Sequence, residues 1–113
     1  TLELARGSNC TAHIDWSQVP LLSNVQKLAD DGVITGASDR NWLSYGDDVG
    51  MPKEFTAAQR ALLTDPQTSG GLLVSCSPES VKEVLDIFDQ HHFLGARVIG
   101  QMSKRQEKPL VVS

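Results

Sequence analysis

The sequence predicts a domain of the α/β (α+β) class, with a mixed, partly antiparallel sheet and helices packed on it. Strand-like runs alternate with helical runs along the chain, which indicates layers of strand and helix. The last two strand-like runs are joined only by the short polar turn "KRQEK", so we expect them to be antiparallel. With 113 residues, the chain is long enough for one domain with a core and too short for two of ordinary size.

Composition and charge exclude several classes of function. The chain is 40% hydrophobic, and no apolar run approaches the roughly 18 residues of a membrane helix. Ten basic residues against fourteen acidic ones give a net charge of −4, and the basic residues are scattered, which argues against a nucleic-acid partner. Cys10 and Cys76 lack metal-ligand spacing and lie in strand-like runs, so we expect small buried side chains in a cytoplasmic, reducing setting.

The first residues predict the end of a helix and then a strand. Leu2 and Ala5 lie one helical turn apart before Gly7, as in the last turns of a helix whose beginning is absent. Residues 10–16, "CTAHIDW", alternate between apolar and polar, which is the pattern of a half-buried strand. His13 falls on the polar side, where an exposed histidine is favoured over a ligand.

A helix and a long irregular segment follow. Pro20 is suited to the first turn of a helix, an apolar stripe continues from it, and Gly32 ends it. Residues 33–53 show no sustained period and carry three glycines, so we expect an ordered loop fixed by its aromatic residues. Arg40 and Asn41 in this loop are candidate contacts for an anion or a partner, although a surface ion pair of Arg40 remains an equal alternative.

The second half of the chain predicts two more helices and three strands. Residues 56–63 have Thr56 as an N-cap and form a short helix, and residues 72–76 form a strand. Ser77, followed by proline and glutamate, begins the next helix. A strand begins at about Ala96, and "PLVVS" is the final strand. The helix after Ser77 carries a core-facing stripe of Val81, Val84, Leu85 and Phe88.

The sequence predicts no metal site. His91 and His92 are adjacent and have no third ligand nearby, whereas zinc takes three or four. Histidines in the last turn of a helix are favoured by the helix dipole alone. The glycine-rich phosphate loops G-x-x-x-x-G-K-[ST] and G-x-G-x-x-G are also missing.

The strongest candidate site is the loop between the 56–63 helix and the strand at 72–76. The aspartate before proline is suited to accept backbone amides of the turn that follows. The polar residues offer an amide and two hydroxyls, and the two glycines permit a nest of amides for an anion. A capped structural turn is the alternative. The candidate substrate- or phosphate-binding residues are Asp65, Gln67, Thr68, Ser69, Gly70 and Gly71.

The segment "DPQTSGGLL" resembles the signature near the C-terminus of the selenophosphate synthetase (selenide, water dikinase) family, in the superfamily of aminoimidazole ribonucleotide synthetase. The upstream segment "IDWSQVPLLSNVQKLADDGVITGASDRNWLSYG" is similar to the same family in order and spacing. The resemblance covers residues 2–76 well, and the final third mainly in pattern. It implies the fold of an aminoimidazole ribonucleotide synthetase C-terminal domain, incomplete on its N-terminal side, over residues 1–113.

The resemblance implies an enzyme that uses ATP, Mg²⁺ and selenide to make selenophosphate for selenocysteine and selenouridine synthesis, expected to be a homodimer. The family's nucleophile, lysine and metal-binding aspartates lie upstream, so no catalytic or metal-binding role is carried onto this chain, and Cys10 and Cys76 do not match the nucleophile position. The chain alone is expected to be inactive and to bind neither ATP nor Mg²⁺. The resemblance favours a place for the 65–71 loop beside the active-site cleft.

Two other functions remain open from the sequence. The first is a non-catalytic binding or interaction module with the same fold. The second is an ATP-dependent relative in the superfamily that acts on another substrate. Whether the parent nucleophile is cysteine or selenocysteine is not readable from these residues.

Overall fold

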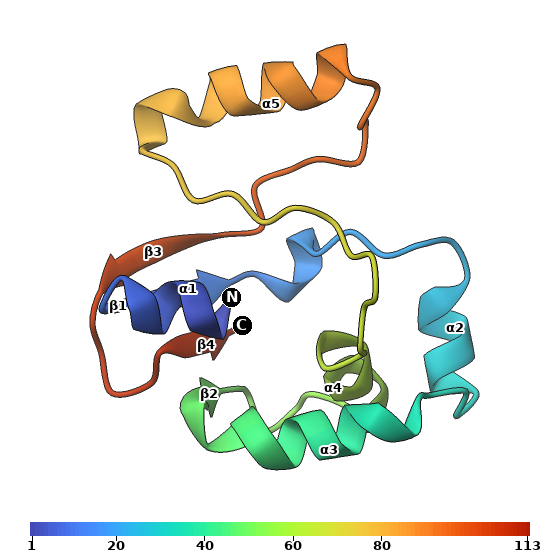
Figure 1. Cartoon of the computed structure of the whole chain (residues 1–113). Helices are drawn as coiled ribbons and strands as arrows, with labels where there is room; N and C mark the ends of the chain where they lie inside the picture. Colours follow the sequence, from blue (N-terminus) through green and yellow to red (C-terminus); the bar gives the residue numbers. More distant parts are fainter.

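The computed structural model describes residues 1–113 and contains a four-stranded mixed sheet in the order β2-β4-β1-β3 (Figure 1). β1 is antiparallel to β3, with Ala12 opposite Met102, and parallel to β4, with His13 opposite Val111. β2 pairs with β4 in parallel. The mixed sheet that the sequence predicts is confirmed. Its strands are β1 (Cys10–Ile14), β2 (Val49–Gly50), β3 (Gly100–Lys104) and β4 (Leu110–Val112).

The last two strands differ from the prediction in their partners. β3 and β4 run in opposite directions, as expected, but β1 lies between them and pairs with both. The Thr11 hydroxyl donates to the carbonyl oxygen of Lys108 at 2.8 Å and accepts from the amide of Gln106 at 2.8 Å. These bonds hold the turn between β3 and β4 across the end of β1. β3 also begins later than predicted, at Gly100 rather than Ala96.

Five helices accompany the sheet, and they are short. They are α1 (Leu2–Gly7), α2 (Val25–Asp30), α3 (Gly36–Tyr45), α4 (Ala57–Leu63) and α5 (Val81–Gln90). α1 contacts β1, and α2 contacts α4. The buried apolar residues are mostly small, namely Ala5, Ala12, Ile14, Ala29, Ala61 and Val112. None of the helices has the length and hydropathy that crossing a bilayer requires.

The prediction of an irregular segment over residues 33–53 is wrong. This segment forms α3, a 3₁₀ turn and β2. Two hydrogen bonds from side chains of α3 hold it against α4. The Ser38 hydroxyl donates to the carbonyl oxygen of Ala61 at 3.1 Å. The side-chain amide of Asn41 donates to the carbonyl oxygen of Thr64, directly after α4, at 2.7 Å. A helix held by side-chain contacts to backbone needs no regular apolar stripe, which is why periodicity missed it.

The helix predicted from Pro20 begins later, at Val25. Asn24 before it has a φ of 67°, in the left-handed region, so the chain turns directly before the helix. Gly32, with a φ of 83°, follows the end of α2 and allows the chain to leave it, as predicted.

The short helix predicted over residues 56–63 is confirmed as α4, and its start is a complete capping box. The amide of Gln59 donates to the Thr56 hydroxyl at 3.1 Å, and the Gln59 side chain accepts from the Thr56 amide at 2.8 Å. We expect Thr56→Ala to lower the free energy of unfolding by about 1 kcal/mol, because one of the free amides at the helix start loses its acceptor. Thr56→Ser keeps the oxygen and is the control. Equal urea midpoints for the two variants would contradict a role for the cap.

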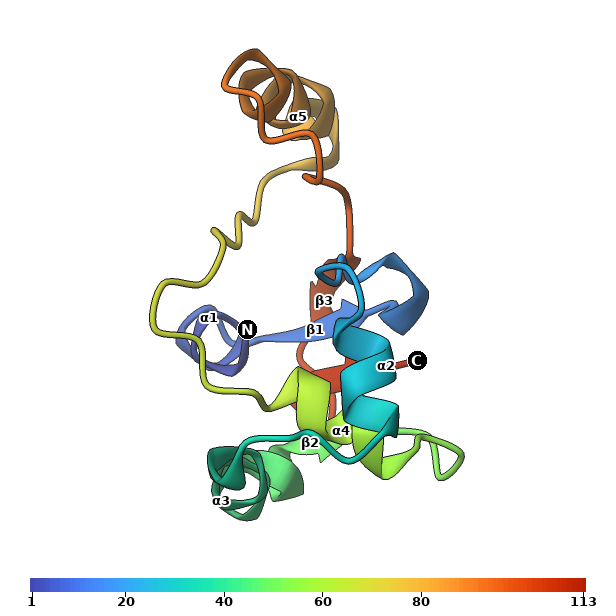
Figure 2. The same cartoon turned by 90° about the vertical axis from the view of Figure 1, so that its right-hand side faces the viewer.

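The strand predicted at residues 72–76 is not formed. The segment lies exposed and without sheet pairing, and both edges of β1 are already taken by β3 and β4. Because Cys76 lies in this segment, it is exposed. Cys10, in β1, is only half-buried, so the prediction that both cysteines are buried is wrong. The helix predicted after Ser77 is confirmed as a 3₁₀ turn at Pro78–Ser80 that leads into α5. Figures 1 and 2 both show α5 standing away from the sheet.

Candidate functional site

The predicted loop at residues 65–71 follows directly after α4 and is exposed from Pro66 onward. Thr68 and Ser69 form its turn. Neither of their hydroxyls makes a hydrogen bond within the chain. The nearby polar side chains do form such bonds, namely those of Thr35, Asn41, Asp65 and Gln67. Two exposed hydroxyls with free hydrogen-bonding capacity are available to an external group such as a phosphate.

Asp65 anchors the start of the loop, but not in the way the sequence predicts. Its carboxylate accepts from the Thr35 hydroxyl at 3.1 Å and from the side-chain amide of Gln67 at 2.7 Å. It therefore bonds side chains and not the backbone amides of the following turn. Asp65 also lies at the rim of a cavity of about 220 Å³ that is mainly apolar and lies among α2, α3 and α4.

The two glycines do not form the predicted nest of amides. Neither Gly70 nor Gly71 has a positive φ, and Gly32 is the only glycine that does. A nest alternates right- and left-handed residues, so its geometry is not present. A Cβ on Gly70 would lie 3.1 Å from the Cβ of Gln67, whereas Gly71 has open space around it. The loop is therefore able to accept a ligand through side chains, without a preformed amide cradle.

Of the two candidate contact residues Arg40 and Asn41, the structure brings only Asn41 to the loop. Asn41 donates to the carbonyl oxygen of Thr64, the residue before Asp65. Arg40 donates to the carbonyl oxygen of Gly36 in its own helix at 3.1 Å and makes no ion pair within the chain. Sequence reasoning missed Thr35, whose hydroxyl holds Asp65, because residues 33–53 were expected to be irregular.

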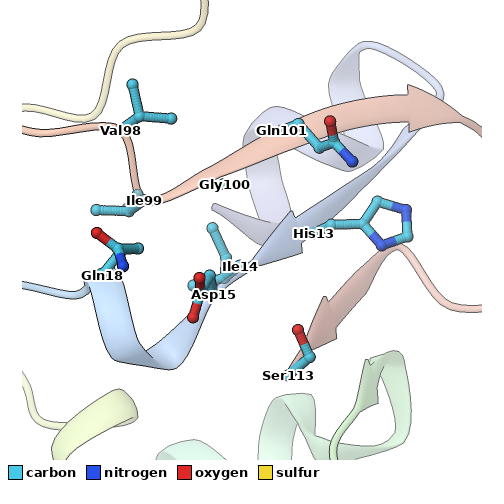
Figure 3. Close-up of a pocket in the computed structure, with 9 residues that line it drawn as sticks. All are labelled: His13, Ile14, Asp15, Gln18, Val98, Ile99, Gly100, Gln101 and Ser113. Carbon is cyan, nitrogen blue, oxygen red and sulfur yellow. The ribbon is translucent and has the colours of Figure 1, made fainter.

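A second, open cavity lies where β1 ends and β3 begins (Figure 3). Its volume is about 320 Å³. His13 at its edge is half-buried, and its Nε2 shares a hydrogen bond with the Ser103 hydroxyl at 2.9 Å. The histidine that the sequence places on the polar side of β1 thus forms a hydrogen bond across to β3. The cavity is lined by His13, Ile14, Asp15, Gln18, Val98, Ile99, Gly100, Gln101 and Ser113.

The two carboxyls with a shifted pKa lie outside the loop. A hydrogen bond from Arg6 holds the pKa of Asp48 below its usual value, and the charges of Arg6, Lys108 and Arg105 act in the same direction. The pKa of Glu79 is also lowered, because its carboxyl accepts from its own backbone amide and from the Ser77 hydroxyl. No group of three or more histidine, cysteine, aspartate or glutamate side chains is placed to hold a metal ion.

Comparison with known proteins gives one family and a consistent set of relatives. The family model described as "AIR synthase related protein, C-terminal domain" matches residues 1–113. The chain is 53% identical over 112 residues to a protein of Paraburkholderia xenovorans named "Selenide, water dikinase", covering 99% of this chain and 32% of that protein. Proteins of the same name in Pseudomonas straminea and Rhizobium meliloti are 53% identical over 110 residues and 51% identical over 85 residues. These matches cover 97% and 75% of this chain, and 31% and 24% of the two proteins. The chain thus spans about a third of the length of the curated relatives it matches most fully.

Proposed function

The chain belongs to the family of AIR synthase related C-terminal domains, and we propose that it is the C-terminal domain of an enzyme that makes selenophosphate from selenide, ATP and water. The observation that carries the proposal is the 53% identity to a selenide, water dikinase over 99% of the chain. In this proposal the nucleotide-binding and metal-binding residues belong to an N-terminal domain. The product serves selenocysteine and selenouridine synthesis, and the enzyme is a cytoplasmic homodimer.

Within that enzyme, we assign the 65–71 loop to contact with phosphate. Asp65 is held by Thr35, and Asn41 holds the backbone just before it, so the base of the loop is fixed to α3. Thr68 and Ser69 extend beyond this base with unpaired hydroxyls. Hydroxyl donors to a charged phosphate oxygen form stronger hydrogen bonds than neutral pairs do.

The residues of this loop suit phosphate better than Mg²⁺. Magnesium in proteins is bound by carboxylates together with waters and substrate phosphates. Asp65 is the loop's only carboxylate, and both of its oxygens already accept hydrogen bonds. Asp65 is therefore poorly suited to hold Mg²⁺, and we expect the chain alone to be inactive.

We predict that Thr68→Ala combined with Ser69→Ala lowers selenophosphate formation in the full-length protein that carries this domain. Each hydrogen bond to a charged group contributes about 1.5–3 kcal/mol, so we expect kcat/KM for ATP to fall at least about ten-fold. The melting temperature should stay unchanged, because these hydroxyls have no partner within the chain. The measurement is the steady-state rate of ATP-dependent selenophosphate formation.

Ser77→Ala is the matched control, because it removes an exposed hydroxyl that contacts Ser80, outside the loop. It should leave the rate unchanged. If the double variant retains the kinetics of the unaltered enzyme, the loop has no part in phosphate contact, although the family assignment would stand.

A further inference from the structure

We propose that Asn41 is a positioning residue for the reaction, and that it acts through the backbone of Thr64 without touching the phosphate itself. Its side chain fixes the place on α3 from which the 65–71 loop begins. The inference rests on the proposed function, in which this loop contacts phosphate.

The loop begins where α4 runs out of hydrogen-bond donors of its own. The last carbonyls of a helix have no partner within the helix, so they need donors from elsewhere. The Ala61 carbonyl oxygen accepts from the amide and the hydroxyl of Thr64, at 3.3 and 3.4 Å. The Thr64 carbonyl oxygen accepts from no backbone amide, and its donor is the side-chain amide of Asn41 at 2.7 Å. Asn41 therefore fixes the peptide group that leads from α4 into Asp65.

Asn41 belongs to a polar stripe on α3 that engages this end of α4. Thr35, Ser38 and Asn41 are spaced by three residues, so they lie along one side of the helix. Ser38 is 2% exposed, and its hydroxyl lies 3.1 Å from the carbonyl oxygen of Ala61 and 3.1 Å from the Thr35 hydroxyl. The Thr35 hydroxyl donates to Asp65. Asn41 is the member of the stripe that bonds to backbone beyond the last residue of α4.

The bond between Asn41 and Thr64 is suited to hold one geometry. Only the amide nitrogen of an asparagine side chain can pair with a carbonyl oxygen, so the orientation of this side chain is determined. Both residues are half-buried, and water therefore competes less for the bond than it would at an exposed pair. A small displacement of a binding group can cost a large factor in rate, so a fixed base for the hydroxyls of Thr68 and Ser69 matters to the reaction.

The same bond reduces a charge that would oppose an anion. The C-terminal end of a helix carries a partial negative charge on its unpaired carbonyls. α4 ends directly before the 65–71 loop, so these carbonyls lie next to the segment assigned to phosphate. Because Asn41 donates to the Thr64 carbonyl oxygen, part of this negative charge is compensated within the protein.

A double-mutant cycle in the full-length protein tests the proposal, with the steady-state rate of ATP-dependent selenophosphate formation as the readout. Asn41→Ala alone should lower kcat/KM for ATP at least about five-fold. In protein that already carries Thr68→Ala and Ser69→Ala, the same change should lower kcat/KM less than about two-fold, because the groups that Asn41 positions are gone. A purely structural defect would lower the rate by the same factor in both backgrounds.

Two further variants separate the hydrogen bond from the presence of a side chain. Asn41→Asp keeps the size of the side chain, but a carboxylate cannot donate to the Thr64 carbonyl oxygen and adds a negative charge. Its kcat/KM for ATP should fall at least about three-fold below that of Asn41→Ala. Ser44→Ala is the matched control on α3, because the Ser44 hydroxyl donates at 2.9 Å to the carbonyl oxygen of Arg40 in the same helix. It should leave the kinetics unchanged, and melting temperatures report that each variant is folded.

Equal factors for Asn41→Ala in the two backgrounds would overturn the proposal, because Asn41 would then act independently of the loop. An Asn41→Asp variant as active as the unaltered enzyme would overturn it too. If instead the protein with Thr68→Ala and Ser69→Ala keeps unaltered kinetics, the assignment of the loop to phosphate fails, and the positioning role fails with it.

Discussion

Replacing Gly100 by alanine is expected to lower the free energy of unfolding by about 3 kcal/mol or more. Gly100 lies opposite Ile14 where β3 meets β1. A Cβ at this position would lie 1.9 Å from the carbonyl oxygen of His13, and backbone atoms cannot move aside as a flexible side chain can. The alanine variant must therefore separate β3 from β1 at one end of the pair. Urea unfolding, followed by circular dichroism, measures the change.

Gly95→Ala is the matched control for this prediction. No atom lies within 4 Å of a Cβ built on Gly95, and its φ is not positive. Alanine at this position restricts the unfolded chain without a clash, so stability should stay the same or rise slightly. If both variants unfold at the same urea concentration, the close approach of β3 to His13 is not present in solution.

Replacing Thr11 by valine is expected to cost about 2–4 kcal/mol of unfolding free energy. Thr11 is fully buried, and its hydroxyl both donates to Lys108 and accepts from Gln106. Valine has nearly the same shape but leaves the part-buried carbonyl of Lys108 and amide of Gln106 without their partner. The turn between β3 and β4 should loosen, and hydrogen exchange at the Gln106 amide should accelerate.

Thr11→Ser separates the hydroxyl from the methyl group. Serine keeps both hydrogen bonds and loses only one methyl, so it should retain slow exchange at Gln106 and a smaller loss of stability, about 1 kcal/mol. A serine variant as unstable as the valine variant would show that packing of the methyl group, and not the hydroxyl, holds this turn.

Local signals in the sequence were enough to predict α4 and β1. Thr56 and Gln59 lie three apart, so the capping box is visible in the sequence and confirmed in the structure. α3 could not be predicted in this way, because Ser38 and Asn41 hold it through hydrogen bonds to α4 that join residues 23 apart. The pairing of β3 and β4 with β1 also depends on contacts distant in sequence, including that of Thr11 with Lys108.

In the candidate site, too, local sequence signals were enough for some features, whereas others depend on contacts distant in sequence. The composition of residues 65–71 and their resemblance to a family signature were enough to single out the loop. The partner of Asp65 was not predictable, because Thr35 lies 30 residues upstream in a segment without periodicity. The predicted nest depended on backbone angles at Gly70 and Gly71, which glycine permits but does not dictate.

The most direct test of the central claim is hydrogen exchange at residues 65–71 in the full-length protein, with and without saturating Mg²⁺ and ATP. If the hydroxyls of Thr68 and Ser69 contact the phosphates, nucleotide should slow exchange across the loop, and the 113-residue chain alone should show no such change. Exchange that is unaffected by nucleotide in the full-length protein, while residues elsewhere become protected, would contradict the claim that this loop reaches the phosphates.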